Sequence, residues 1–126
     1  MTEPPVQDML DALRQDLLRF VYPYGSELKL QNCIEAALCQ TGYTFQREYI
    51  NGSDRIDFLV TDGDQGIALE CKIKGGPTAV LEQLLRYANL PEVDAILLVT
   101  SRHTHRFDCE TLNDKPFSIA WIAGNF

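Results

Sequence analysis

The chain has 126 residues, of which 45% are hydrophobic, and its formal net charge at pH 7 is −7. This length suits one hydrophobic core and is too short for two, so we expect a single domain over residues 1–126. The negative charge argues against a protein that coats nucleic acid by bulk attraction, because non-specific affinity grows with the number of phosphates that basic side chains neutralise. It leaves room for a local basic face.

The first residues, MTEPPVQDML, contain no basic segment followed by an apolar one. No stretch of the chain reaches the roughly 20 apolar residues that a membrane helix needs. We therefore predict a cytoplasmic protein without membrane association. The cysteines, Cys33, Cys39, Cys71 and Cys109, form no CxxC pair, and three of them fall in apolar segments. Free, mostly buried thiols are expected rather than disulfides, which suits a reducing compartment.

Two helices are predicted at the start of the chain. In residues 6–21 apolar side chains recur every three or four positions, which is typical of an amphipathic helix. Its apolar face either closes the core or forms a dimer interface, and the first use is the commoner. A second helix is expected from about Ser26 to Gln40, with Ser26 as its N-cap and Gly42 as its stop.

Three strands joined by short turns follow the helices. They are predicted at residues 43–50, 54–60 and 66–73, with turns at Asn51-Gly52 and at 62–64. This spacing indicates an antiparallel meander. After Gly75-Gly76-Pro77 the apolar spacing becomes helical, up to about Asn89.

Two more strands complete the predicted sheet. Residues 94–100 form a continuous apolar run, typical of a strand covered on both faces, and a polar segment separates it from the last strand at 117–123. The third and fourth strands should be parallel because a helical crossover joins them. The element order therefore predicts an α/β fold with a mixed sheet and helices on its faces.

A strand with charges on one face is the most informative feature of the sequence. Alternation places Ala68, Glu70 and Lys72 on one face of the strand at 66–73, opposite a core-facing row of apolar residues. An ion pair between Glu70 and Lys72 is the simple structural explanation. Asp57, however, stands between apolar residues on the neighbouring strand, where an acid is costly without a partner. We expect Asp57 and Glu70 to meet, and a divalent cation such as Mg²⁺ or Mn²⁺ would relieve their repulsion.

These residues carry a resemblance to a known superfamily. Asp57, followed after twelve residues by Glu70-Cys71-Lys72, resembles the motif of the PD-(D/E)XK nucleases, over about residues 26–123. The resemblance implies a restriction-endonuclease-like α/β fold, to which the helix at 6–21 is an addition. Gln83 and Tyr87, four residues apart on the helix after the ExK strand, resemble the QxxxY motif of the RecB-type branch. The proline of the motif's name is absent, since Ile56 precedes Asp57.

The resemblance implies a role for each residue of the motif. Asp57 and Glu70 would bind Mg²⁺ or Mn²⁺, Cys71 would lend only its backbone carbonyl, and Lys72 would be catalytic. Gln83 and Tyr87 would position the substrate or the catalytic lysine. Relatives often add a Glu from the preceding helix, and Glu27 is preferred here over Glu35 because Glu27 falls within the apolar stripe. Glu27 is also explained as a first-turn acid, and Glu48 is a weaker candidate.

The activity that the resemblance implies is hydrolysis of DNA phosphodiester bonds, leaving 5′-phosphate and 3′-hydroxyl ends. Basic residues expected near the site are Arg47, Arg55, Lys72, Lys74 and Arg86, and residues 101–106 add Arg102, Arg106, His103 and His105 as binding groups, unless that loop is only solvated. The small size favours a homodimer or a larger complex. The alternatives are a catalytically silent module of the same fold that binds nucleic acid or a protein, and a regulatory subunit that docks through the first helix.

Overall fold

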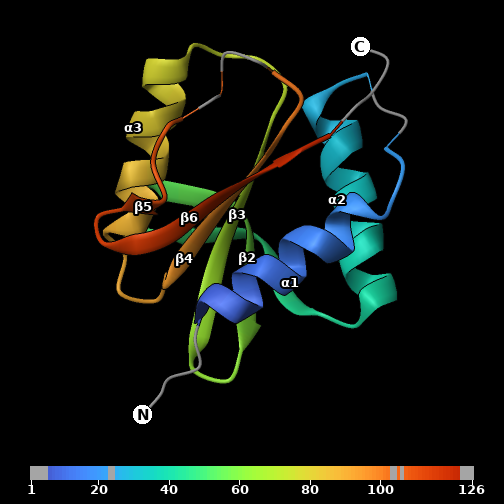
Figure 1. Ribbon diagram of the computed structural model, residues 1–126, viewed down its shortest axis with the longest axis horizontal. Coiled ribbons are helices and arrows are strands. Elements are labelled where there is room, and N and C mark those ends of the chain that lie inside the picture. The colour runs from blue at the N-terminus through green and yellow to red at the C-terminus, as the bar shows by residue number, and fades with distance from the viewer. Residues whose placement is uncertain (1–5, 23–24, 103–104, 106, 123–126) are drawn as a thin grey trace.

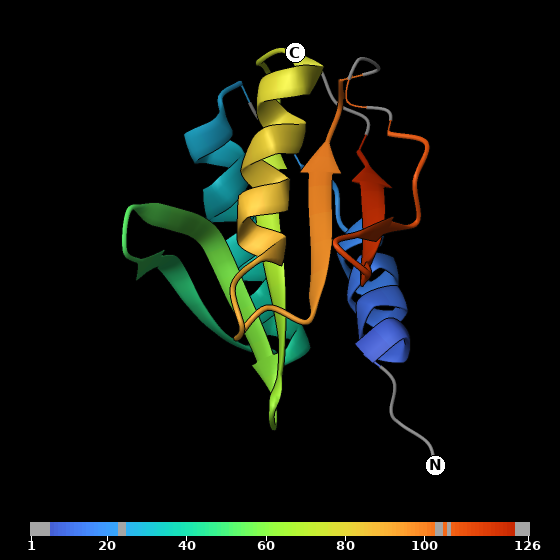
Figure 2. The same ribbon diagram turned by 90° about the vertical axis from the view of Figure 1, so that its left-hand side faces the viewer.

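The computed structural model describes residues 6–22, 25–102, 105 and 107–122. Its elements, in chain order, are α1 (Val6–Leu18), α2 (Glu27–Thr41), β1 (Thr44–Asn51), β2 (Asp54–Asp62), β3 (Gln65–Lys72), α3 (Pro77–Ala88), β4 (Ala95–Thr100), β5 (Thr111–Leu112) and β6 (Lys115–Trp121). The strands form one sheet, with α1 and α2 on one face and α3 on the other (Figures 1 and 2). The predicted α/β fold with a mixed sheet and helices on its faces is therefore confirmed.

The order of strands in the sheet is β1-β2-β3-β4-β6-β5. The first three strands pair antiparallel, as the predicted meander requires. β3 pairs parallel with β4, as expected from the helical crossover, and β4 pairs parallel with β6. Helix α3 is the crossover, so it follows the charged end of β3 directly.

The end of the chain differs from the prediction. The short strand β5 lies in the segment predicted as a loop, and β6 spans Lys115–Trp121, so it begins two residues before the predicted start at 117. The predicted end, residue 123, lies outside the described residues. Asn113 and Asp114 have φ angles of 52° and 66° and form a tight turn between β5 and β6. Asn and Asp tolerate this left-handed backbone well, so the polar stretch forms a hairpin.

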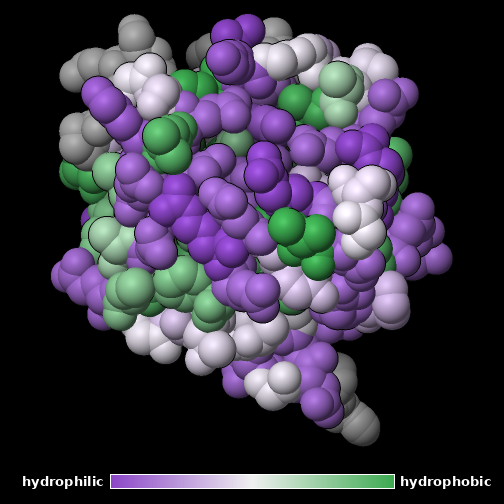
Figure 3. Space-filling model, turned by 180° about the vertical axis from the view of Figure 1, so that it is seen from behind, coloured by the Kyte–Doolittle hydropathy of each residue, from purple (hydrophilic) through white to green (hydrophobic). Residues whose placement is uncertain are grey.

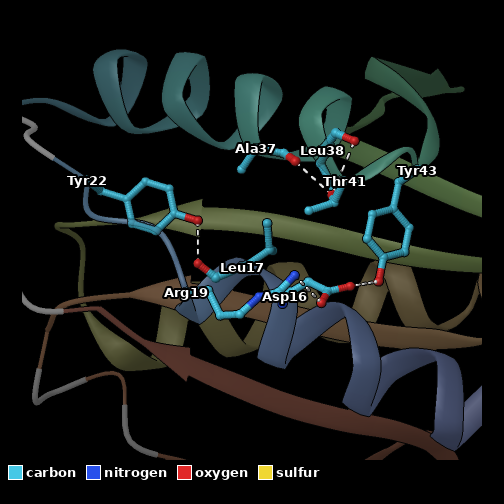
Figure 4. Close-up of polar contacts among 8 residues, drawn as sticks. All are labelled: Asp16, Leu17, Arg19, Tyr22, Ala37, Leu38, Thr41 and Tyr43. Atoms are coloured by element: carbon cyan, nitrogen blue, oxygen red, sulfur yellow. Dashed lines mark hydrogen bonds and ion pairs between the residues drawn. The ribbon is translucent and has the colours of Figure 1, made fainter.

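Helix α1 closes the core on its face of the sheet, as expected. Leu10, Leu13 and Leu17 are completely buried in the cluster that also contains α2 and the sheet. The helix ends at Leu18 rather than at residue 21. The Tyr22 hydroxyl donates to the Leu17 carbonyl at 2.6 Å and satisfies one of the free carbonyls of the helix end (Figure 4).

Tyrosine and threonine hydroxyls also hold the layer formed by α1 and α2. The Tyr43 hydroxyl donates to Asp16 Oδ2 at 2.6 Å and so links the chain before β1 to α1 (Figure 4). Burial and the Asp16 carboxylate raise the pKa of Tyr43, so the hydroxyl stays protonated and donates. Thr41 Oγ1 donates to the Ala37 carbonyl at 2.7 Å in the last turn of α2.

The predicted caps of α2 are confirmed. Ser26 Oγ accepts a hydrogen bond from the Lys29 backbone amide at 3.1 Å, and Gly42 ends the helix with a left-handed φ of 85°. The cysteines are free, as predicted. Only Cys71 is completely buried, whereas Cys39 and Cys109 are exposed, so the expectation of mostly buried thiols is wrong. Among the described helices, none has the length and apolar character to span a membrane.

Gly66 and Asp94 set the register between β3 and β4. The Gly66 amide donates to Asp94 Oδ2 at 2.9 Å, and the Asp94 amide donates to the Gly66 carbonyl at 2.7 Å. The next residues, Ile67 and Ala95, are the first pair of the parallel ladder. A Cβ atom at Gly66 would lie 2.4 Å from the Glu92 carbonyl oxygen, so only glycine allows this approach.

We predict that Gly66→Ala lowers the free energy of unfolding by about 1–3 kcal/mol, because the main chain around Glu92 would have to move. Gly25→Ala is the matched control, since a Cβ atom there meets nothing within 4 Å, and its effect should stay below about 0.5 kcal/mol. Urea denaturation of both variants measures the difference. Equal stabilities would show that the close approach at Gly66 is not needed.

Candidate functional site

Strands β2 and β3 part at the predicted acidic residues. Their backbone ladder runs from Asp62–Gln65 to Phe58–Leu69 and ends there. Beyond this point the Asp57 amide donates to Glu70 Oε1 at 3.2 Å, and the Cys71 amide donates to Asp57 Oδ2 at 2.9 Å. Each carboxylate therefore satisfies a backbone amide that the separation of the strands leaves without a ladder partner. The prediction that Asp57 and Glu70 meet is confirmed.

Both strands of the β1–β2 hairpin change face at this point. Phe58 packs in the core beneath α1 and α2, whereas Ile56, two residues earlier, packs in the core beneath α3. Regular alternation would put both on one face. The β1–β2 register passes from Arg47–Phe58 to Tyr49–Ile56 and skips Glu48, whose φ angle is 55°. The outer part of the hairpin is therefore turned relative to the rest of the sheet, and Figure 2 shows it projecting from one edge.

The turned hairpin, the start of α2 and the outer side of α3 surround a cavity of about 600 Å³. Of the predicted residues, Glu27, Asp57, Glu70, Lys72, Gln83 and Tyr87 all line it. They come from α2, β2, β3 and α3, so four elements position one site. Most of the described residues that line the cavity are polar or charged. The face of the molecule seen from behind the view of Figure 1 is largely hydrophilic, with several hydrophobic patches (Figure 3).

The two carboxylates are held in a poorly solvated position. Burial, followed by the neighbouring charge of Asp57, raises the pKa of Glu70 to about 8, although Lys72 acts in the opposite direction. Burial also raises the pKa of Asp57. The hydrogen bond from the Cys71 amide and the charge of Lys72 act to lower this pKa, whereas the charge of Glu27 acts to raise it. The cavity therefore favours either a proton or a metal cation beside these oxygens.

Lys72 lies at the rim of the acidic pair. Its Nζ is 3.5 Å from Glu70 Oε2, and its side chain is 20% exposed while that of Glu70 is 3% exposed. The simple ion pair expected for an ExK strand is therefore present. The exposed fraction of Lys72 leaves its ammonium group accessible from the cavity, where it can contact a second anion.

Tyr87 and Gln83 lie on the same wall of the cavity. The Tyr87 hydroxyl donates to the Arg55 carbonyl at 2.6 Å and fastens α3 to the turned part of β2. Burial, and then the charges of Glu70 and Asp57, raise the pKa of Tyr87, so this hydroxyl remains a donor. Gln83, one turn earlier on α3, is half-buried and lines the cavity.

The structure distinguishes between the two glutamates of α2. Glu27 Oε1 accepts a hydrogen bond from the Ile73 amide at 3.1 Å, beside the end of β3. Glu35 forms an ion pair with Arg47 at 2.8 Å and does not line the cavity. Glu48 is exposed and lies 4.0 Å from Arg55. Of the two α2 glutamates, Glu27 is therefore the one at the site.

Cys71 lies beside the site only through its main chain. Its thiol is completely buried in the core beneath α1 and α2, and burial raises the thiol pKa well above its ordinary value. Its amide contacts Asp57, as described above. The expectation that this side chain points into the core is confirmed.

The expected basic residues divide into two groups. Arg55, Lys72 and Arg86 line the cavity, and Arg86 forms an ion pair with Asp54 at 3.2 Å. Arg47 does not line the cavity: its guanidinium lies over the Phe58 ring and contacts α2, because β1 changes face only after this residue. Its Nη2 donates to Gln31 Oε1, a residue of the cavity lining, at 3.3 Å. Lys74 is exposed and does not line the cavity.

The prediction for residues 101–106 is only partly testable, because His103 and Arg106 lie outside the described residues. Arg102 is exposed. His105 is completely buried, with Nδ1 3.0 Å from Thr100 Oγ1 and Nε2 2.9 Å from the Gly75 carbonyl oxygen. It therefore ties the end of β4 to the segment between β3 and α3, and the expectation of a solvent-facing binding group is wrong for His105.

Several residues at the site were not anticipated from the sequence. Gln31, Ile50, Ser53 and Asp54 line the cavity beside the motif residues. Gln31 lies four positions after Glu27 on α2, and this helical spacing is a signal that was available in the sequence. The hairpin residues among them, Ile50, Ser53 and Asp54, gave no such signal. They reach the cavity only because the strands change face at Glu48 and Asp57.

The donor set fits a hard divalent cation with a mostly hydrated shell. In the part of the chain that the structure describes, no three side chains of His, Cys, Asp or Glu form a ready metal cluster. Asp57 and Glu70 nevertheless meet at an open cavity, and each has a second carboxylate oxygen beyond the one that accepts a backbone amide. Magnesium typically binds through one or two carboxylates and keeps several waters, so two carboxylates suffice for it.

Comparison with known proteins adds no assignment: the chain matches no protein-family model and no curated protein.

We predict that, in EDTA, the free energy of unfolding falls as the pH rises from about 4.5 to about 8. Glu70 has a pKa of about 8 in the fold and an ordinary value of 4.5. Between these values the folded state binds the proton more tightly, so stability is lost as pH rises, by about 1.4 kcal/mol for each unit of pKa difference. Asp57 acts in the same direction.

The matched variants are Glu70→Gln, which keeps an oxygen for the Asp57 amide, and Glu82→Gln, an exposed residue of α3. Urea denaturation across this pH range should give a flatter profile for Glu70→Gln and an unchanged one for Glu82→Gln. Parallel profiles for Glu70→Gln and the unmodified protein would contradict the burial of an ionisable Glu70.

Proposed function

We propose that the protein is a metal-dependent nuclease of the PD-(D/E)XK type that hydrolyses DNA phosphodiester bonds. The observation that carries the proposal is the convergence of Asp57, Glu70 and Lys72 on one open cavity, where burial raises the pKa of both carboxylates. The antiparallel meander, the crossover helix and the parallel fourth strand support a restriction-endonuclease-like fold.

Asp57 and Glu70 would hold Mg²⁺ or Mn²⁺, with the Cys71 carbonyl and Glu27 as further candidate ligands. The bound ion supplies Lewis-acid stabilisation of the phosphate and lowers the pKa of a coordinated water. Burial disfavours the ionised forms of Asp57 and Glu70. A cation beside them would therefore compensate a negative charge that is poorly solvated in the fold.

Lys72 would be the catalytic group. Its partly exposed ammonium can orient the attacking water or lie beside the negatively charged phosphate in the transition state. The family resemblance implies cleavage to 5′-phosphate and 3′-hydroxyl ends. Gln83 lines the cavity and would position the substrate, while Tyr87 supports the wall through its bond to Arg55.

A catalytically silent module of the same fold is the second candidate, and one observation favours it. Asp57, Glu70 and Glu27 each accept a backbone amide, so the acidic residues have a structural role without any metal. Such a role explains why acids occur at the separation of β2 and β3. It does not require Lys72 beside them, and this residue separates the two candidates experimentally.

We predict that Mg²⁺ or Mn²⁺ raises the melting temperature at pH 8. Saturation to about 100 times the dissociation constant corresponds to about 2.7 kcal/mol of stabilisation. Asp57→Asn should lose this response, because one negatively charged ligand is removed, whereas Glu82→Gln should keep it. An unchanged melting temperature of the unmodified protein in both ions would refute the metal site.

We predict that Lys72→Ala lowers the cleavage rate about 100-fold or more, in line with the typical contribution of a positioned acid or base. Lys29→Ala, which removes an exposed lysine of α2, is the control and should cleave normally. Labelled single-stranded, duplex and branched DNA, with Mg²⁺ and with EDTA, provide the assay. If Lys72→Ala cleaves as fast as the control, Lys72 is not catalytic, and if no DNA is cut in metal the silent module is favoured.

A further inference from the structure

The turned hairpin brings an exposed apolar side chain to the mouth of the cavity. Ile50 and Arg55 face each other across β1 and β2, and both line the cavity. Ile50 is 65% exposed, and the side chain of Arg55 is 67% exposed. Gly52 and Ser53, at the tip beside them, also line the cavity and add little bulk. A flat group can therefore approach this pair from solvent.

The chemistry of this pair suits a nucleobase. Bases stack on apolar side chains and on the plane of a guanidinium group, and they do so without sequence preference because every base has a π-face. Apart from Ile50, Gly52 and Tyr87, the described residues that line the cavity are polar or charged. Ile50 thus suits a small flat ligand better than a broad protein interface.

The charges around the cavity do not suit a DNA duplex. Arg86 is paired with Asp54, Lys72 with Glu70, and Arg55 lies 4.0 Å from Glu48. Duplex binding uses many phosphate contacts, and specific interfaces bury about 1,000–2,500 Å² of protein surface. A cavity of about 600 Å³ has the size of a small-ligand pocket. It can hold one or two nucleotide units of a single strand.

We infer that the substrate is an unpaired DNA strand, with one base held against Ile50 and Arg55 while the adjoining phosphate lies at Asp57, Glu70 and Lys72. The inference rests on the proposed nuclease function and specifies its substrate. The hairpin selects the strand by stacking, and the acidic cavity reads no sequence.

Binding is measured separately from cleavage. The Lys72→Ala background, in Mg²⁺, is titrated by fluorescence anisotropy against a labelled 20-nucleotide strand and against its blunt duplex. The strand should bind at least about tenfold more tightly. Adding Ile50→Ala should weaken its binding about fivefold or more, as expected for loss of a stacking contact. Val21→Ala, at an 89% exposed apolar residue that does not line the cavity, should change nothing.

Salt dependence gives an independent test. The logarithm of the association constant falls with the logarithm of the salt concentration, with a slope of about −0.7 for each phosphate of a single strand that the protein neutralises. In the Lys72→Ala background Arg55 and Arg86 remain as lining cations, and they allow a slope no steeper than about −1.4. A slope steeper than about −5, or equal affinity for strand and duplex, would overturn the inference.

Cleavage separates the two proposals. In Mg²⁺ the unmodified protein should cut the strand and a single-stranded overhang at least about tenfold faster than the blunt duplex, and Ile50→Ala should raise KM more than it lowers kcat. Cleavage of the blunt duplex at the rate of the strand refutes the substrate inference while the nuclease proposal stands. Absence of all cleavage refutes the nuclease proposal, and the anisotropy titration then still decides whether the cavity selects an unpaired strand.

Discussion

The site depends on one constraint: β2 and β3 separate at their charged ends, and backbone amides there must find other acceptors. Asp57 and Glu70 each accept an amide from the opposite strand, and Glu27 accepts the amide of Ile73. An unsatisfied buried amide costs on the order of 1–3 kcal/mol, so the separation is sustainable only with acceptors at these positions. The same bonds draw three acidic residues together.

This arrangement explains how a structural contact becomes a chemical site. The opening between the strands is filled from the α3 side by Tyr87 and from the other by the first turn of α2, which leaves a cavity above the carboxylates. Burial makes ionisation of Glu70 unfavourable, and Lys72, whose Nζ lies 3.5 Å from Glu70 Oε2, compensates that charge in part. The residues that complete the fold are thus the residues that would attract a metal and a phosphate.

Contacts outside the cavity lining, one buried and one half-buried, hold the elements that form its walls. His105 joins the end of β4 to the Gly75 carbonyl, and so fixes the segment that leads from Lys72 into α3. Tyr49 and Asn51 both donate to Glu92 Oε2 at 2.6 Å, which anchors the hairpin to the loop after α3. The hydrogen bond from Tyr49 is the main cause that lowers the pKa of Glu92, so the acceptor remains ionised. The walls are therefore built by residues that do not line the cavity.

The sequence by itself determined the element order, the parallel pairing of β3 with β4, the caps of α2 and the meeting of Asp57 with Glu70, because periodicity, turn residues and strand alternation are local properties. Tertiary structure alone decided that Arg47 faces α2, that His105 is buried and that Ile50 reaches the cavity. These three outcomes depend on the change of face at Glu48 and on the packing of segments distant in the chain. Alternation predicts a face only while a strand stays regular, and this hairpin becomes irregular at the site.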